Sequence, residues 1–245
     1  MQRDVAFSSR FAGRRHAPSW PVVAGGCWRP ARPRGGWFVL GLTAAFVLAV
    51  SVAGCGPARI AVPPLDPQGA AAGALAAYDK NADGVLDEPE LTACPGLRAA
   101  LPYADTDRDG RLSREEIAGR IRQYQADRAG LLFLRAVVTL DGKPLSGAIV
   151  TLVPEPFLGS GVPGAQGTTD ASGQCVLQTP GMDAPGVSCG IFRVRVSLQD
   201  ASGRERLPPQ YHEQTTLGVE VAMGNRVLAE GLELNLRSAI GRGGP

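Results

Sequence analysis

Histidine is almost missing from the sequence, and with it the residue that most catalytic sites use for proton transfer. Only two of the 245 residues are histidine: His16 lies in a segment that we expect to be removed, and His212 lies in a polar loop. The motifs H-E-x-x-H and C-x-x-C are absent, and no glycine-rich phosphate loop precedes an expected helix. These absences argue against zinc peptidases, dithiol oxidoreductases and nucleotide-dependent enzymes. We therefore predict that the protein is not an enzyme.

The sequence also lacks a basic stripe on which a nucleic acid could rest. Of its 25 lysine and arginine residues, seven lie in residues 1–54, which contain only one of the 23 acidic residues. Residues 55–245 therefore carry 18 basic and 22 acidic residues, and the weakly basic character of the whole chain reflects its first segment. Because phosphate-backbone binding depends on clustered positive charge, we predict no nucleic-acid partner.

What the sequence does have is two acidic segments of twelve residues with the same pattern. Residues 79–90 read DKNADGVLDEPE and residues 105–116 read DTDRDGRLSREE, so each follows D-x-[DN]-x-D-G and ends in glutamate. Oxygen-bearing residues recur at alternate positions, and Gly84 and Gly110 allow the sharp turn that brings those oxygens together. The segments resemble EF-hand calcium loops, and the resemblance implies two calcium sites.

The resemblance assigns a calcium ligand to positions one, three, five, seven, nine and twelve of each loop. Position seven would bind through its backbone carbonyl oxygen, and the other positions through side chains. The expected ligands are Asp79, Asn81, Asp83, Val85, Asp87 and Glu90 in the first loop, and Asp105, Asp107, Asp109, Arg111, Ser113 and Glu116 in the second. A solvated turn is the alternative, since aspartate, asparagine and glycine also favour turns. Two complete copies weaken that alternative, because the unpaired carboxylates of each loop would repel one another.

The stretch between the two loops is short and rich in helix-breaking residues. The loops begin only 26 residues apart, and Pro95, Gly96 and Pro102 limit the helices between them to one or two turns. Leu86 and Leu112, both at position eight, fit a short strand pair that joins the loops. Short helices argue against the large opening by which calcium sensors act, so we expect a structural or weak extracellular-type site.

The first 54 residues have the features of a targeting segment. A flank with three arginines precedes the uncharged apolar run of residues 37–53, and Cys55 follows Ala53 and Gly54. This arrangement resembles a bacterial lipoprotein signal, which implies cleavage before Cys55, lipidation of Cys55 and attachment to the extracytoplasmic face of a membrane. The alternative is a single N-terminal transmembrane anchor that is not cleaved. Residues 55–69 are rich in proline, and we expect an extended spacer there.

From residue 131 the apolar residues alternate with a period of two, which predicts β-strands. The inward-facing residues would be Leu132, Leu134, Ala136, Val138, Leu140, Phe192, Val194, Val196, Leu198, Leu217, Val219, Val221, Leu232, Leu234 and Leu236, with Glu220, Glu233 and Asn235 outside. About seven strands over residues 131–237 suit a β-sandwich. We therefore predict an α+β protein of two domains, a helical calcium module at 70–129 and the sandwich, with a flexible tail at 238–245.

Three runs of the second half also carry a family resemblance. They resemble the carboxypeptidase regulatory-like, or transthyretin-like, sandwich, and read VVTLDGKPLSGAIVTLVP, GTTDASGQCVL and GIFRVRVSL. The later run LPPQYHEQTTLGVEV resembles an extension found in bacterial lipoprotein members of that family. Because most members are accessory or adhesive modules, the resemblance implies a binding or structural part rather than a catalyst.

Few cysteines remain once Cys27 and Cys55 are assigned to the signal and the lipid anchor. An extracytoplasmic location permits disulfides, and Cys175 and Cys189 lie on neighbouring predicted strands. We predict a disulfide between these two residues, with two separate buried thiols as the alternative. Cys94 would then remain a small buried residue beside the first loop.

Together these features predict a calcium-binding, lipid-anchored extracytoplasmic protein with a structural or partner-binding role, whose partner is an envelope protein or polymer. One alternative is an adaptor whose sandwich binds carbohydrate or another polymer, for which Phe157 and Tyr211 are the only aromatic residues in expected loops. Another is an accessory protein of a hydrolase, or a hydrolase with a concave site around His212.

Overall fold

The computed structural model describes residues 65–238. The expected signal segment, Cys55, the first part of the expected spacer and nearly all of the tail therefore lie outside the described residues. Within residues 65–238, no helix is both long enough and apolar enough to cross a membrane.

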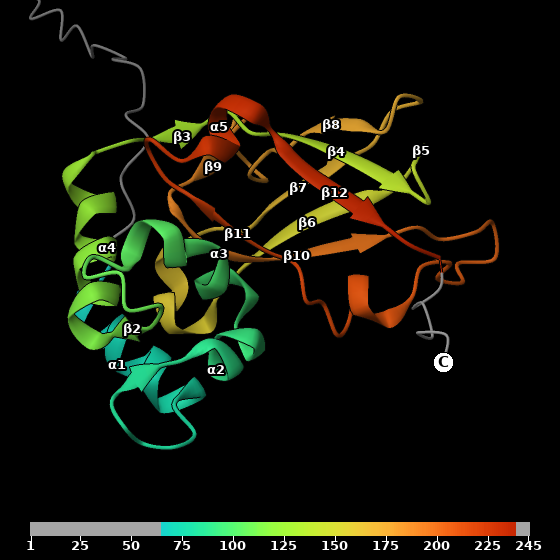
Figure 1. Cartoon of the computed structure of the whole chain (residues 1–245). Helices are drawn as coiled ribbons and strands as arrows, with labels where there is room; N and C mark the ends of the chain where they lie inside the picture. The colour runs from blue at the N-terminus through green and yellow to red at the C-terminus, as the bar shows by residue number, and fades with distance from the viewer. Residues whose placement is uncertain (1–64, 239–245) are drawn as a thin grey trace, which may run out of the picture. The chain divides into compact units, whose positions relative to one another are not determined.

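The helical part contains both acidic loops, each between two helices. Its elements are α1 (Pro67–Tyr78), β1 (Val85–Leu86), α2 (Glu88–Ala93), α3 (Pro95–Ala104), β2 (Leu112–Ser113) and α4 (Arg114–Ala126). The first loop joins α1 to α2 and the second joins α3 to α4 (Figure 1). This is the helix–loop–helix arrangement that the two acidic patterns predict.

Helix α1 begins three residues before the boundary that the sequence suggests for the helical module. Asp66 caps it, because its carboxylate accepts hydrogen bonds from the backbone N–H groups of Gln68 and Gly69 at 3.1 and 3.0 Å. Pro67 occupies the first helical position, where its missing N–H costs nothing. A proline that suggests an extended spacer in the sequence therefore starts a helix in the structure.

The helices between the loops are short, although α3 is longer than expected. Helix α2 has six residues and α3 has ten, so α3 exceeds the one or two turns that the prolines suggest. Pro95 begins α3 rather than ending a helix, and Pro102 lies in its last turn. Both prolines are thus placed where a helix tolerates them.

The second part of the chain consists mainly of strands. They are β3 (Leu131–Leu132), β4 (Arg135–Leu140), β5 (Lys143–Pro144), β6 (Ile149–Pro154), β7 (Ala165–Thr168), β8 (Gln174–Val176), β9 (Val187–Ser188), β10 (Gly190–Ser197), β11 (Gly218–Val221) and β12 (Leu232–Leu236). A short helix, α5 (Arg226–Glu230), precedes the last strand. The described residues thus form a mixed α+β fold, with more strands than the seven expected because β3, β5 and β9 have only two residues each.

Two four-stranded sheets organise this second part. One has the strand order β11-β10-β6-β7, and the other has the order β12-β4-β5 with β8 paired to β4 (Figure 1). Strand β12 runs parallel to β4, whereas β10 pairs antiparallel to both β6 and β11. The alternation in the sequence is confirmed in β10, where Phe192, Val194 and Val196 are fully buried.

The helices and the sheets share one continuous hydrophobic core within residues 65–238. Its members include Leu91, Leu97 and Ile121 from the helices and Val138, Val150, Val194 and Leu234 from the strands. The expected separation into two domains is therefore not confirmed by the packing. Glu220, which the alternation places outside, is instead buried at 3 % exposure, because α4 covers this side of β11.

Helix α3 lies so close to β11 that only glycine fits at the contact (Figure 1). A Cβ atom on Gly218 would lie 2.0 Å from the carbonyl oxygen of Pro95. A Cβ atom on Gly96 would lie 2.7 Å from Cγ2 of Ile191. Neither the backbone of Pro95 nor the branched, buried side chain of Ile191 in β10 can move aside cheaply. The two glycines therefore fix the segment between the acidic loops against β11 and β10.

The substitution Gly218→Ala tests this contact. We expect it to lower the free energy of unfolding by about 2–4 kcal/mol, because the added methyl group would force α3 away from β11. Thermal and denaturant unfolding followed by circular dichroism measure the loss. The control is Gly119→Ala in α4, where the nearest atom to an added Cβ is the end of Arg122 at 3.6 Å. This control should leave stability unchanged or raise it by up to about 1 kcal/mol; equal losses in both variants would contradict the close-contact interpretation.

Candidate metal centre

The first acidic loop closes on the carboxylate of Asp79, which directly follows α1. This carboxylate accepts hydrogen bonds from the N–H groups of Ala82 and Gly84, at 2.6 and 3.0 Å. The backbone turns back on itself through positive φ angles at these same two residues, 59° and 85°. The left-handed conformation is natural for Gly84 and is held at Ala82 by the bond to Asp79.

The second loop repeats this geometry residue for residue. Asp105 accepts hydrogen bonds from the N–H groups of Arg108 and Gly110, at 2.6 and 3.0 Å. Arg108 and Gly110 have φ angles of 63° and 81°, close to those of their counterparts in the first loop. Two segments with different sequences therefore adopt one backbone conformation, set by the aspartate at position one and the glycine at position six.

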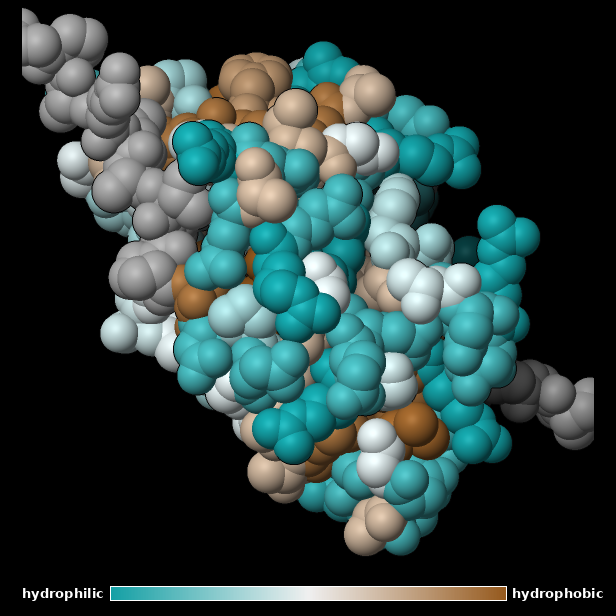
Figure 2. All heavy atoms as spheres, turned by 90° about the vertical axis from the view of Figure 1, so that its left-hand side faces the viewer, coloured by the Kyte–Doolittle hydropathy of each residue, from teal (hydrophilic) through white to brown (hydrophobic). Residues whose placement is uncertain are grey.

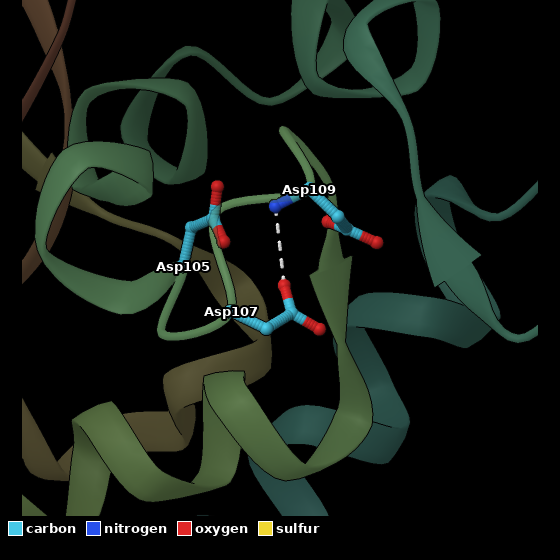
Figure 3. Close-up of side chains that lie close together, drawn as sticks. All are labelled: Asp105, Asp107 and Asp109. Carbon is cyan, nitrogen blue, oxygen red and sulfur yellow. Dashed lines mark hydrogen bonds between the residues drawn. The ribbon is translucent and has the colours of Figure 1, made fainter.

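The side chains at positions three and five line the inside of each turn. In the second loop, the backbone N–H of Asp109 donates to Asp107 at 3.2 Å (Figure 3). Carboxylate oxygens of Asp105, Asp107 and Asp109 lie within 4.8 Å of one another. In the first loop the N–H of Asp83 donates in the same way to Asn81, at 2.9 Å.

The glutamate at position twelve ties the end of each loop back to its beginning. Glu90 accepts hydrogen bonds from the N–H groups of Lys80 at 2.6 Å and Asp87 at 3.1 Å. Glu116 accepts them from the N–H groups of Thr106 at 2.8 Å and Ser113 at 2.9 Å. Each glutamate thus sits with both oxygens turned into its loop, where a bidentate calcium ligand is required.

These hydrogen bonds favour the ionised form of both glutamates. The bond from the backbone of Lys80 is the main reason that the pKa of Glu90 lies below its usual value. Partial burial raises the pKa of Glu116, but the hydrogen bonds from Ser113 and Thr106 outweigh burial and lower it overall. Both groups are therefore carboxylates, and not acids, at neutral pH.

The two loops are joined by the short strands β1 and β2. These strands are antiparallel, with Val85 opposite Ser113 and Leu86 opposite Leu112. Leu86 and Leu112 are completely buried, as their apolar character at position eight predicts. Arg111 of the second loop also approaches Asp83 of the first, with 4.0 Å between Nη1 and Oδ2. The loops therefore form a pair and not two independent turns.

The donors fit a hard divalent cation. Each loop presents oxygen atoms only, including four carboxylates at the ligand positions, and the backbone N–H groups already hold these side chains in place. Crowded carboxylates repel one another, and a bound cation would relieve that repulsion. Calcium accepts six to eight such oxygens in a flexible geometry, whereas magnesium demands a smaller octahedral shell.

The comparison with known families agrees with the geometry of the second loop. A family model described as EF hand matches residues 97–118, which span most of α3, the second loop and the start of α4. No curated protein and no solved structure matches the chain. The EF-hand match supports calcium binding by this region; the first loop lies outside the match and shares the hydrogen-bond pattern of the second.

The predicted disulfide is not present. Cys94, Cys175 and Cys189 are all free and buried. Cys175 lies on β8 opposite Ala136 of β4. Its sulfur faces Gly167 of β7, and a Cβ atom added to that glycine would lie 3.2 Å from the sulfur. Cys189 lies between β9 and β10 near the backbone of Met223. Cys175 and Cys189, fourteen positions apart in the chain, are therefore not bonded to each other.

Two short motifs in the sequence match enzyme patterns in the wrong structural context. Residues 186–190 read GVSCG and fit G-x-S-x-G, but Ser188 is buried in β9 and is followed by a strand instead of a helix. Residues 159–164 read GSGVPG and fit G-x-G-x-x-G, but they precede β7 and not a helix N-terminus. Nε2 of His212 donates a hydrogen bond to the carbonyl oxygen of Leu207 at 3.1 Å, a local loop contact.

Alkylation under denaturing conditions without reductant tests the state of the cysteines. We expect the peptides that contain Cys175 and Cys189 each to carry the alkyl label, because neither thiol is bonded to the other. In the native protein the same thiols should react slowly, since burial raises the pKa of both. Burial likewise raises the pKa of Cys94 to about 12, so it serves as the internal standard for a protected thiol. Recovery of a peptide pair joined through Cys175 and Cys189 would contradict this account.

Proposed function

We propose that the protein binds two calcium ions and uses them structurally, as a membrane-anchored extracytoplasmic protein that is not an enzyme. The observation that carries the proposal is the equivalence of the two loops. In both, the aspartate at position one, the side chain at position three and the glutamate at position twelve make the same backbone hydrogen bonds. The second loop alone has a family match, and its twin geometry is what supports a second site.

A structural role fits the packing of the helices better than a sensor role. Sensors open on calcium binding and expose an apolar groove to a target. Here the apolar side chains of the helical part are buried in the same core as the sheets: Leu91, Leu97, Ile117 and Ile121 are at most 1 % exposed. The part of the α4 face that Figure 2 colours is mainly hydrophilic, with small separated hydrophobic areas. The strands therefore cover the apolar side chains that a sensor would offer to its target.

We also propose that the strands form a sandwich of the carboxypeptidase regulatory-like kind. The support comes from the two four-stranded sheets, whose inward residues include Val138, Val150, Val196 and Leu234. The turn after β4 adopts positive φ at Asp141 and Gly142, 52° and 78°, as a tight hairpin turn requires. In this family such a part serves binding or structure, so we assign it the partner-binding surface for an envelope protein or polymer.

The carbohydrate-binding alternative has less support than the structural role. Tyr211 is buried, and its hydroxyl accepts a hydrogen bond from the N–H of Arg237 at 2.9 Å. Phe157 packs edge-on against Tyr78, with 6.5 Å between the ring centroids. Both loop aromatics are thus engaged within the protein and not free to stack on a sugar. Within residues 65–238, Phe133, at 57 % exposure, is the exposed aromatic side chain that could serve such a role.

Anchoring rests on the sequence around Cys55, outside the described residues. We propose cleavage before Cys55 and lipidation of its thiol, which would hold the calcium-binding part outside the cytoplasm. A single transmembrane anchor formed by residues 37–53 is the alternative, and it gives the same location. Lipidation is favoured because the small residues Ala53 and Gly54 directly precede the cysteine.

Calorimetric titration with calcium tests the proposed function. The wild-type protein should bind two calcium ions and prefer calcium to magnesium, and Glu90→Gln or Glu116→Gln should each weaken one site by about tenfold or more, because a bidentate charged ligand is lost. The matched control is Glu115→Gln, which removes the same charge from an exposed neighbour of Glu116. Absence of binding heat in the wild type, or equal effects of Glu116→Gln and Glu115→Gln, would refute the calcium sites.

Metabolic labelling with palmitate tests the anchor. We expect label on the wild type and on Cys27→Ala, and none on Cys55→Ala, because only Cys55 would carry the lipid. Globomycin, which blocks the lipoprotein signal peptidase, should leave a longer precursor. Unlabelled wild-type protein that stays in the membrane fraction would favour the transmembrane alternative.

A further inference from the structure

Each calcium loop is connected to the sheet through a buried glutamate, an arginine and a tyrosine. The first group contains Glu155, which is fully buried at the end of β6. Arg193 of β10 donates from Nε to both of its oxygens at 3.1 Å, and the hydroxyl of Tyr78 donates to Oε2 at 3.2 Å. Arg193 also donates from Nη2 to the Tyr78 oxygen at 2.7 Å. Tyr78 is the last residue of α1 and directly precedes Asp79, the first ligand of the first loop.

The second group is built from the same three residue types. Glu220 of β11 accepts hydrogen bonds from Nε and Nη2 of Arg120 at 2.6 and 3.0 Å, and a short one from the hydroxyl of Tyr124. The guanidinium of Arg120 lies over the rings of Tyr103 and Tyr124, 5.4 and 5.6 Å from their centroids. Asn225 completes the group by bonding both Arg120 and Glu220.

The second group lies on the helix that leaves its loop. Arg120 lies four residues after Glu116 on α4, so the two side chains lie one helical turn apart on the same face. Each loop therefore has one flanking helix pinned to the sheet: α1 at the entrance of the first loop and α4 at the exit of the second. Because a buried carboxylate without its partners is costly, both groups hold these helices in a single position.

We propose that Glu155 and Glu220 are positioning residues for calcium binding, acting on the first loop through Tyr78 and on the second through Arg120 and Tyr124. The sheet thus sets the affinity of the calcium sites from outside the loops. This inference rests on the calcium binding proposed above. Coupling between sites is reciprocal, so if a partner bound at β10 or β11 changed calcium affinity, calcium would change the affinity for that partner by the same factor.

The proposal predicts site-selective effects, which titration of one loop at a time can measure. Tyr78→Phe, made together with Glu116→Gln so that only the first loop binds calcium, should weaken calcium binding about three- to tenfold. Tyr124→Phe, made together with Glu90→Gln, should do the same at the second loop. The controls exchange the partners: Tyr78→Phe is combined with Glu90→Gln, and Tyr124→Phe with Glu116→Gln. In these two proteins the tyrosine change should alter calcium affinity less than twofold.

The measurement is calorimetric titration with calcium at a temperature well below unfolding, with the unfolding midpoint recorded for every variant. A merely structural role would lower that midpoint without any selectivity between the loops. Equal weakening at both loops, or no weakening at either, would overturn the proposal. If Tyr124→Phe does not fold, Arg120→Lys serves instead, because it keeps the positive charge but loses the two-point bond to Glu220.

The two possible failures are distinguishable. If the protein with both loops intact binds no calcium, the proposed function fails and the positioning role fails with it. If calcium binds but none of the tyrosine or arginine variants shifts its affinity selectively, only the positioning role is overturned.

Discussion

Crowding of negative charge in two short turns is the constraint on which the helical part depends. Each loop gathers four carboxylates at its ligand positions within twelve residues, and three of those in the second loop have oxygens within 4.8 Å of one another. Hydrogen bonds from the loop's own N–H groups hold these carboxylates in place but do not neutralise them. A cation of the size and charge of calcium balances the charge with the same side-chain positions. The carboxylates of the loops thus lie at positions that suit a divalent cation.

Contacts outside the loops fix their flanking helices to the sheet. The segment between them docks on β11 through Gly218, with no room for a side chain. Buried Glu155 and Glu220 fix a helix of each loop to β10 and β11. Helices held in this way do not separate as those of a sensor do. Separation would also expose apolar side chains that the helices bury in the core they share with the sheets. This packing is the reason for our proposal that calcium bound at the loops has a structural role.

The sequence predicts the features that depend on local patterns. The spacing of oxygens and glycines identifies both loops, the apolar residues at position eight locate β1 and β2, and the alternation in β10 gives its buried face. Features that depend on contacts distant in the chain are missed. The alternation along the strand places Glu220 among the exposed residues. In the structure it is covered by Arg120, which lies a hundred residues earlier in the chain. The predicted disulfide fails for the same reason, because Cys175 and Cys189 are near in sequence and lie among different neighbours.

Hydrogen–deuterium exchange in calcium and in chelator is the most direct test of the central claim, that calcium orders both loops and acts on the sheet to which they are fixed. The account predicts slower exchange in calcium for the amides of both loops, Gly84 and Gly110 included, and for β11 beside them, with β5 at the far sheet unchanged. Identical exchange in calcium and chelator across both loops would contradict it.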